Sequence, residues 1–150
     1  MPRFMFDTNC MIAAVTRSHR HHLPSADEYN RRLDRGETLM VAAHSLAEAY
    51  SVLTRAPAPL RLSADHAASV LERSFVSQCE VIALDEADYV ALLRSSPVKG
   101  VTGGLVYDAI IAACAGKARV DVFVTYDERH FRRVVDQSLQ IIAPRADDSP

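Results

Sequence analysis

The feature that most constrains the fold is an uninterrupted apolar run near the start of the chain, Phe4-Met5-Phe6, which ends at Asp7. A short apolar run without alternation is typical of a strand buried on both faces, as in the middle of a parallel sheet. In open sheets of this kind, ligands bind beyond the carboxyl ends of the strands. We therefore expect Asp7 to lie at the floor of a functional site.

Strands and helices are predicted to alternate along the whole chain, which indicates a parallel sheet covered by helices on both faces. The predicted strands cover residues 4–6, 38–42, 80–84, 120–125 and 139–143. The predicted helices cover residues 9–15, 24–36, 44–55, 63–77, 85–94, 105–117 and 127–134, with residues 97–100 in a loop.

Length and charge limit the possible classes of function. A chain of 150 residues is expected to form one domain, residues 1–150, with a polar tail at 144–150 that frays. The net charge of -2 excludes binding to nucleic acid through overall charge. Any contact with a polyanion must therefore come from a local basic patch.

Cysteine usage and hydropathy predict a cytoplasmic protein. The three cysteines are widely spaced and form no CxxC pair, which favours free thiols over a disulfide framework or a zinc site. No apolar run approaches the roughly 18 residues that a membrane span needs. No secretory leader is recognisable at the start of the chain, so we expect no association with a membrane.

Acidic residues occur where predicted strands end and inside apolar helices. Asp7 and Asp127 each follow a strand, although an Asp at such a point is also a common helix N-cap. Glu48 is the only charged residue between His44 and Arg55, where it is either a site residue or a solvated helix position. Each of these three positions, taken alone, leaves both interpretations open.

Asp108 is the most informative acid. It is the only charged residue in the run from Gly103 to Ala115, and a helix this apolar is buried over most of its circumference. A buried carboxylate is costly unless it is paired, hydrogen-bonded or bound to a cation. The alternative role for Asp108 is to stabilise the N-terminus of its helix from the first turn.

In a parallel sheet the four acids can converge on one crevice. Neighbouring carboxylates repel, so some retain their protons unless a cation neutralises them. Hard oxygen ligands select Mg²⁺ or Mn²⁺, which favour phosphate oxygens and activate water. The predicted chemistry is metal-assisted cleavage of a phosphodiester, without a covalent protein nucleophile. The predicted metal ligands and catalytic residues are Asp7, Glu48, Asp108 and Asp127.

Weaker signals surround this predicted centre. Asn9 and Thr125 are candidates to hydrogen-bond the acids or a water molecule. Basic side chains just past the acid-bearing strands are candidates for phosphate contacts at the rim, although any one of them is also explained as solvated surface charge. The candidates for nucleic-acid binding are Arg17, His19, Arg20 and Arg129.

Taken together, the motifs resemble the PIN domain family and, within it, the VapC-type toxins of bacterial type II toxin–antitoxin pairs. The matching segments are Phe6-Asp7-Thr8-Asn9 and residues 46–55, 103–113 and 125–131, in the family's order and spacing. The resemblance implies a three-layer α/β/α fold. Its five-stranded parallel sheet is expected to have the first strand at the centre.

The resemblance also implies an activity and partners. It implies a Mg²⁺- or Mn²⁺-dependent endoribonuclease, commonly a homodimer, that a small antitoxin protein inhibits. By resemblance, Asp7 and Asp108 are the principal metal ligands, and Glu48 and Asp127 complete the site directly or through water. The fourth position is the more variable one in the family and is often Asn.

Three other interpretations compete with this one. A haloacid-dehalogenase-type phosphatase needs a second acid two residues after Asp7, where this chain has Asn9. A phospho-receiver domain needs an acidic pair after the first strand and a lysine near the last strand, and the sequence has neither. A PIN domain that binds RNA or a protein without cutting remains, and the complete set of four acids argues against it.

Overall fold

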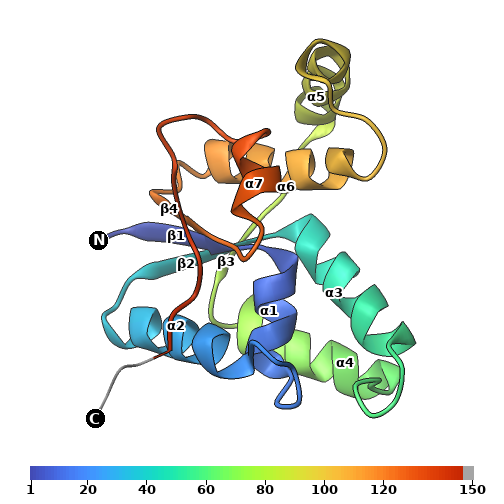
Figure 1. The fold of residues 1–150 in the computed structure, drawn as a ribbon, viewed down its shortest axis with the longest axis vertical. Helices are drawn as coiled ribbons and strands as arrows, with labels where there is room; N and C mark the ends of the chain where they lie inside the picture. Colours follow the sequence, from blue (N-terminus) through green and yellow to red (C-terminus); the bar gives the residue numbers. More distant parts are fainter. Residues whose placement is uncertain (147–150) are drawn as a thin grey trace.

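The computed structural model describes residues 1–146. Within them, five strands form one parallel sheet in the order β3-β2-β1-β4-β5, which places β1 (Arg3–Phe6) at the centre (Figure 1). The predicted α/β fold with a central first strand is confirmed. The other strands are β2 (Thr38–Ala42), β3 (Glu80–Ile82), β4 (Val122–Val124) and β5 (Gln140–Ile142).

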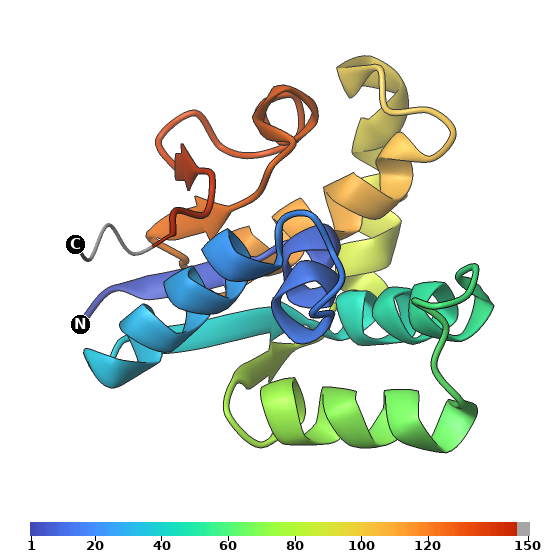
Figure 2. The ribbon, with the colours of Figure 1, turned by 60° about the horizontal axis from the view of Figure 1, so that its bottom comes forward.

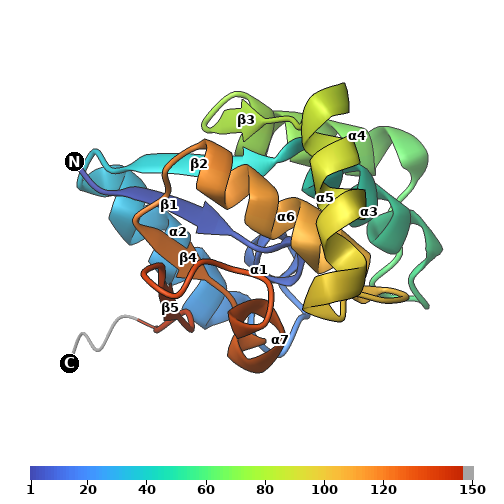
Figure 3. The same ribbon diagram turned by 90° about the horizontal axis from the view of Figure 1, so that it is seen from above.

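Helices cover both faces of the sheet, as Figures 2 and 3 show from two further directions. One face packs against α1 (Thr8–Val15), α2 (His22–Asp34), α3 (Ala43–Arg55) and α4 (Ala64–Leu71), and α4 continues as a π-helical turn, η1 (Glu72–Val76). The other face packs against α6 (Leu105–Lys117) and α7 (Glu128–Arg132), and α5 (Glu86–Lys99) contacts α6.

The apolar run of β1 is buried on both faces, as its lack of alternation predicts. Phe4 and Phe6 lie in the core between the sheet and the layer of α1 to α4. Met5 points the other way, into the core beneath α6 and α7. All three side chains are fully buried, and each contributes about 1.5–3 kcal/mol relative to an exposed position. This double burial fixes β1 in the middle of the sheet.

The helix predicted at 85–94 is longer than expected, and the prediction of a loop at 97–100 is wrong. α5 continues through Pro97 and is capped by Gly100, whose φ of 68° is left-handed. Pro97 has no N–H to donate to the preceding turn, and the helix ends two residues later at Lys99. The Ser96 hydroxyl donates to the Leu92 carbonyl at 2.7 Å. The other predicted boundaries differ by at most two residues.

The described end of the chain is tied to α2. The Glu28 carboxylate is buried, pairs with Arg31 and accepts the Arg145 backbone N–H at 3.3 Å. Arg31 Nη2 donates to the Arg145 carbonyl, also at 3.3 Å. Arg145 thus has fixed partners within the tail predicted at 144–150, whereas residues 147–150 lie outside the described residues.

Two further features are the lengths of the helices and the state of the cysteines. Among the helices of residues 1–146, none is long and apolar enough to cross a membrane. Cys10, Cys79 and Cys114 are free thiols, and two of the three are buried.

Candidate active site

The register of the sheet places Asp7 beside Thr125. Phe6 pairs with Val124 in the parallel ladder, so the next residue of each segment lies at the same edge of the sheet. The Asp7 backbone N–H donates to the Val124 carbonyl at 3.1 Å. The Thr125 hydroxyl donates to Asp7 Oδ2 and accepts the Asp127 backbone N–H at 2.9 Å. Thr125 therefore links two of the predicted site acids.

Asp7 has the capping role that the sequence left open. Its Oδ1 accepts the Cys10 backbone N–H at 2.8 Å, so it is the N-cap of α1. It is also only 2% exposed, and this burial raises its pKa from 3.8 to about 6 despite the hydrogen bonds from Thr125 and Cys10, which lower it. A charged carboxylate at this position is therefore costly unless a cation lies nearby.

Asp108 lies in the first turn of α6 and is half-buried. Burial raises its pKa, and the negative charges of Asp127 and Glu48 raise it further. The charge of Asp108 in turn contributes to the raised pKa of Asp7. The four predicted acids thus share one electrostatic neighbourhood at the carboxyl edge of the sheet.

The two outer acids are hydrogen-bonded to histidines of their own helical segments. Glu48 Oε2 lies 3.0 Å from His44 Nε2, one turn earlier in α3. Asp127 occupies the N-cap position of α7 but does not cap the helix with its side chain. Its Oδ2 instead lies 2.5 Å from His130 Nδ1. Both acids therefore have a partner that holds the carboxylate.

The four carboxylates are ligands that a hard divalent cation prefers, but their present arrangement does not form a site for one. Neighbouring carboxylate charges raise the pKa of Asp7 and of Asp108, and Mg²⁺ or Mn²⁺ is the kind of ion that neutralises such a group of carboxylates. Within residues 1–146, however, no three acidic, histidine or cysteine side chains are arranged to hold an ion. Each outer acid bonds to its histidine through one oxygen, so gathering all four acids around one ion requires a rearrangement of side chains.

A family model of the PIN domain matches residues 4–137, which spans the sheet and all four acids. The chain belongs to the PIN domain family. This membership confirms the resemblance carried by the sequence motifs. It also leaves the phosphatase and receiver-domain interpretations without support.

Known proteins similar to this PIN domain carry the VapC name. Ribonuclease VapC27 of Mycobacterium tuberculosis is 33% identical over 128 residues, which cover 85% of this chain and 87% of VapC27. Ribonuclease VapC40 of the same species is 33% identical over 112 residues, or 75% and 78% of the two chains. The crystal structure of VapBC2 from Rickettsia felis bound to a promoter DNA fragment has a similar fold, with a TM-score of 0.63, 21% identity and coverage of 95% and 98%.

Apart from Thr125, the remaining predicted residues of the PIN domain lie on α1, on the loop that follows it and on α7. Asn9 is exposed on α1 and lines a cleft of about 360 Å³ together with His19. Arg17 and Arg20 are exposed in the loop between α1 and α2, and Arg129 is exposed on α7. Of the two residues predicted to support the acids, Thr125 hydrogen-bonds Asp7 and Asn9 points to solvent.

An aromatic contact holds the basic loop against the acidic segment. The His21 ring stacks on Tyr126 with 4.2 Å between ring centroids, and Tyr126 lies between Thr125 and Asp127 in the chain. The Tyr126 hydroxyl lies 2.9 Å from the Ser25 hydroxyl at the start of α2. The stack therefore holds the loop of residues 16–21 next to the segment that carries Asp127. The contact with Ser25 fixes Tyr126 in turn.

Several supporting residues were not predicted from the sequence. His44 and His130 stand four residues before Glu48 and three residues after Asp127. That helical spacing is the signal that identifies such pairs. Cys10 had no comparable signal, because its contribution comes from a backbone N–H.

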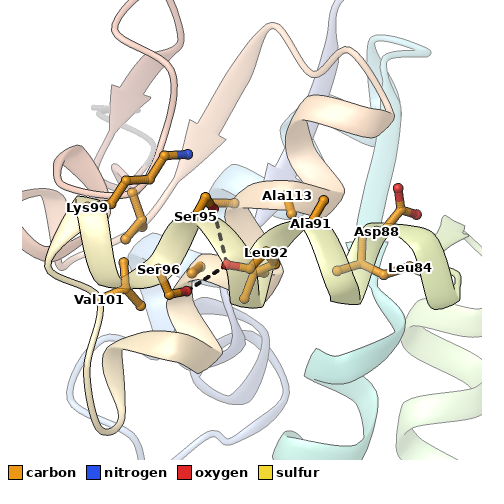
Figure 4. Close-up of a pocket in the computed structure, with 12 residues that line it drawn as sticks. Leu84, Asp88, Ala91, Leu92, Ser95, Ser96, Lys99, Val101 and Ala113 are labelled. Carbon is orange, nitrogen blue, oxygen red and sulfur yellow. Dashed lines mark hydrogen bonds between the residues drawn. The ribbon is translucent and has the colours of Figure 1, made fainter.

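The cavity between α5 and α6 is separate from the acids. It has a volume of about 450 Å³, and none of the four acids lines it. Figure 4 shows Asp88 beside Leu84 at one end and Lys99 near Val101 at the other, with Leu92 between them. It offers no group of ionisable residues like the one at the carboxyl edge of the sheet.

Proposed function

We propose that this PIN domain is a metal-dependent endoribonuclease, the toxin of a type II toxin–antitoxin pair. The observation that carries the proposal is the pair of interacting carboxylates, Asp7 and Asp108, whose pKa values are both raised at the edge where parallel sheets bind ligands. Two relatives at 33% identity are ribonucleases, which supports RNA as the substrate.

Each residue of the site has a specific task in this proposal. Asp7 and Asp108 hold Mg²⁺ or Mn²⁺, with Glu48 and Asp127 completing the set directly or through water. Such an ion, when bound, activates a water molecule and neutralises charge on the scissile phosphate. Thr125 orients the Asp7 carboxylate through its hydroxyl.

RNA is proposed to enter across the basic rim. Arg17 and Arg20 are exposed beside the site, and His19 and Arg129 flank it on the loop and on α7. Arginine and histidine side chains in these places can contact phosphates on either side of the acids, which offsets the acidic centre. Contacts with the backbone position RNA and do not select its sequence.

The proposed partners are a small antitoxin and a second copy of the chain. Membership of the VapC group and the likeness to VapBC2 support the antitoxin. The exposed apolar side chains of α5 support a contact between copies, because α5 projects from the body of the domain (Figure 1). They are Tyr89, Val90, Leu93 and Val98. We also propose a cytoplasmic location, which suits free thiols.

The test is cleavage of total cellular RNA by the purified protein, with Mg²⁺ or Mn²⁺ and with EDTA. Asp7→Asn and Asp108→Asn keep the side-chain volume and remove the charge, and Asp65→Asn, on the exposed surface of α4, is the matched control. We expect discrete products that require metal, persist in the control and vanish in both site variants. Absence of cleavage by the folded, metal-loaded protein would indicate a PIN domain that binds without cutting.

A further inference from the structure

An aromatic pair with no assigned role lies beside the acids. The rings of His44 and Tyr107 are nearly parallel, with 7° between their planes and 5.3 Å between their centroids. His44 is in the first turn of α3, and Tyr107 is in the first turn of α6. The stack therefore joins two helices that each carry one of the site acids.

In this pair His44 is held in place by a hydrogen bond, whereas Tyr107 is exposed to solvent. The His44 ring is fixed by its hydrogen bond to Glu48, so it holds the Tyr107 ring in one orientation. Tyr107 is nevertheless 53% exposed, the highest exposed fraction among the large aromatic side chains that are exposed in residues 1–146. Since His44 covers one ring face, the exposure of Tyr107 belongs to its edge and its other face.

The position of the pair relates it to the chemistry of the site. Tyr107 immediately precedes Asp108 on α6. The charge of His44 lowers the pKa of Asp108, which places both members of the stack within electrostatic reach of the acid centre. A flat ligand group that stacks on Tyr107 therefore lies next to any phosphodiester held at the acids.

We propose that the His44–Tyr107 stack is a binding platform for one unpaired nucleobase of the RNA, adjacent to the scissile phosphate. This inference rests on the proposed nuclease function and adds a base site to it. Proteins recognise single-stranded RNA by stacking splayed bases on aromatic side chains, whereas phosphate contacts carry no sequence information. Such a platform gives the enzyme a preference for unpaired segments.

The test measures stacking apart from cleavage. The probe is a short single-stranded RNA that contains 2-aminopurine, whose fluorescence is quenched when the base stacks, and binding is measured in EDTA. Tyr107→Phe keeps the ring, Tyr107→Leu removes it, and Tyr50→Leu changes another exposed tyrosine, on α3 and outside the proposed contacts. We expect roughly 5- to 100-fold weaker binding and loss of quenching in Tyr107→Leu only.

Three outcomes would overturn the proposal. They are wild-type binding without quenching, equal affinity in Tyr107→Leu and the wild type, and a change of oligomeric state in Tyr107→Leu with unchanged affinity per protomer. The last outcome would make Tyr107 a contact between copies. Failure of the nuclease proposal is seen separately, as absence of cleavage in metal while the binding signal in EDTA persists.

Discussion

Replacing Asp7 by Asn is expected to stabilise the metal-free protein at neutral pH. Burial raises the pKa of Asp7 from 3.8 to about 6, so the folded state binds the proton more tightly than the unfolded state does. Stability therefore falls as the pH rises between these two values, and the full penalty applies above about 6. An amide carries no charge and escapes this penalty.

The magnitude follows from the difference between the two pKa values. At about 1.4 kcal/mol per pKa unit, the buried charge costs ~3 kcal/mol above the higher value. The Asn amide oxygen can still accept the Cys10 backbone N–H, but the hydroxyl of Thr125 must turn to accept from the amide group. We therefore expect a net gain of about 1–3 kcal/mol.

The assay is urea unfolding in EDTA at pH 7.5 and pH 4. The gain of Asp7→Asn should be present at the higher pH and largely absent at the lower one, because the wild-type carboxyl is then protonated in the folded state. Asp65→Asn, on the exposed surface, should change stability by less than about 0.5 kcal/mol. Destabilisation by Asp7→Asn at pH 7.5, or an equal gain at both pH values, would refute the reasoning.

Three further predictions concern other parts of the chain. Glu28→Gln removes a buried charge that pairs with two arginines, and should lower the free energy of unfolding by about 3–5 kcal/mol; an unchanged urea midpoint would contradict this. Gly100→Ala puts a side chain at a φ of 68°, with nothing within 4 Å of the new Cβ. We expect a loss of about 1 kcal/mol in the free energy of unfolding from backbone strain alone, measured in the same assay. A loss several times larger would reveal a clash. MgCl₂ should raise the Tm of the wild type and leave that of Asp108→Asn unchanged, and an equal rise in both would place the ion elsewhere.

Much of the fold was predictable because burial on both faces leaves a mark on the sequence. The run from Phe4 to Phe6 predicts a central strand, and the parallel register then brings Asp7 to the same edge as residues 125–127. Asp108 was predictable for a related reason, since a single charge in an apolar helix needs a partner. These inferences depend only on periodicity and burial.

The rest depended on tertiary contacts that no local pattern encodes. The hydrogen bonds of Glu48 and Asp127 to histidines depend on side-chain rotamers, although the helical spacing made them possible. The stack of Tyr107 on a residue of another helix has no counterpart in sequence spacing. The continuation of α5 through Pro97 to its cap at Gly100 differs from the local signal, because a proline close to a glycine usually marks a loop.

The central claim is that the acids act on one metal centre, and diffraction at the manganese absorption edge tests it most directly. Crystals soaked in MnCl₂ are expected to show an anomalous peak between Asp7 and Asp108, with Glu48 near the ion directly or through a water molecule. A peak at the histidines of the loop between α1 and α2, or none at the acids, would contradict the account.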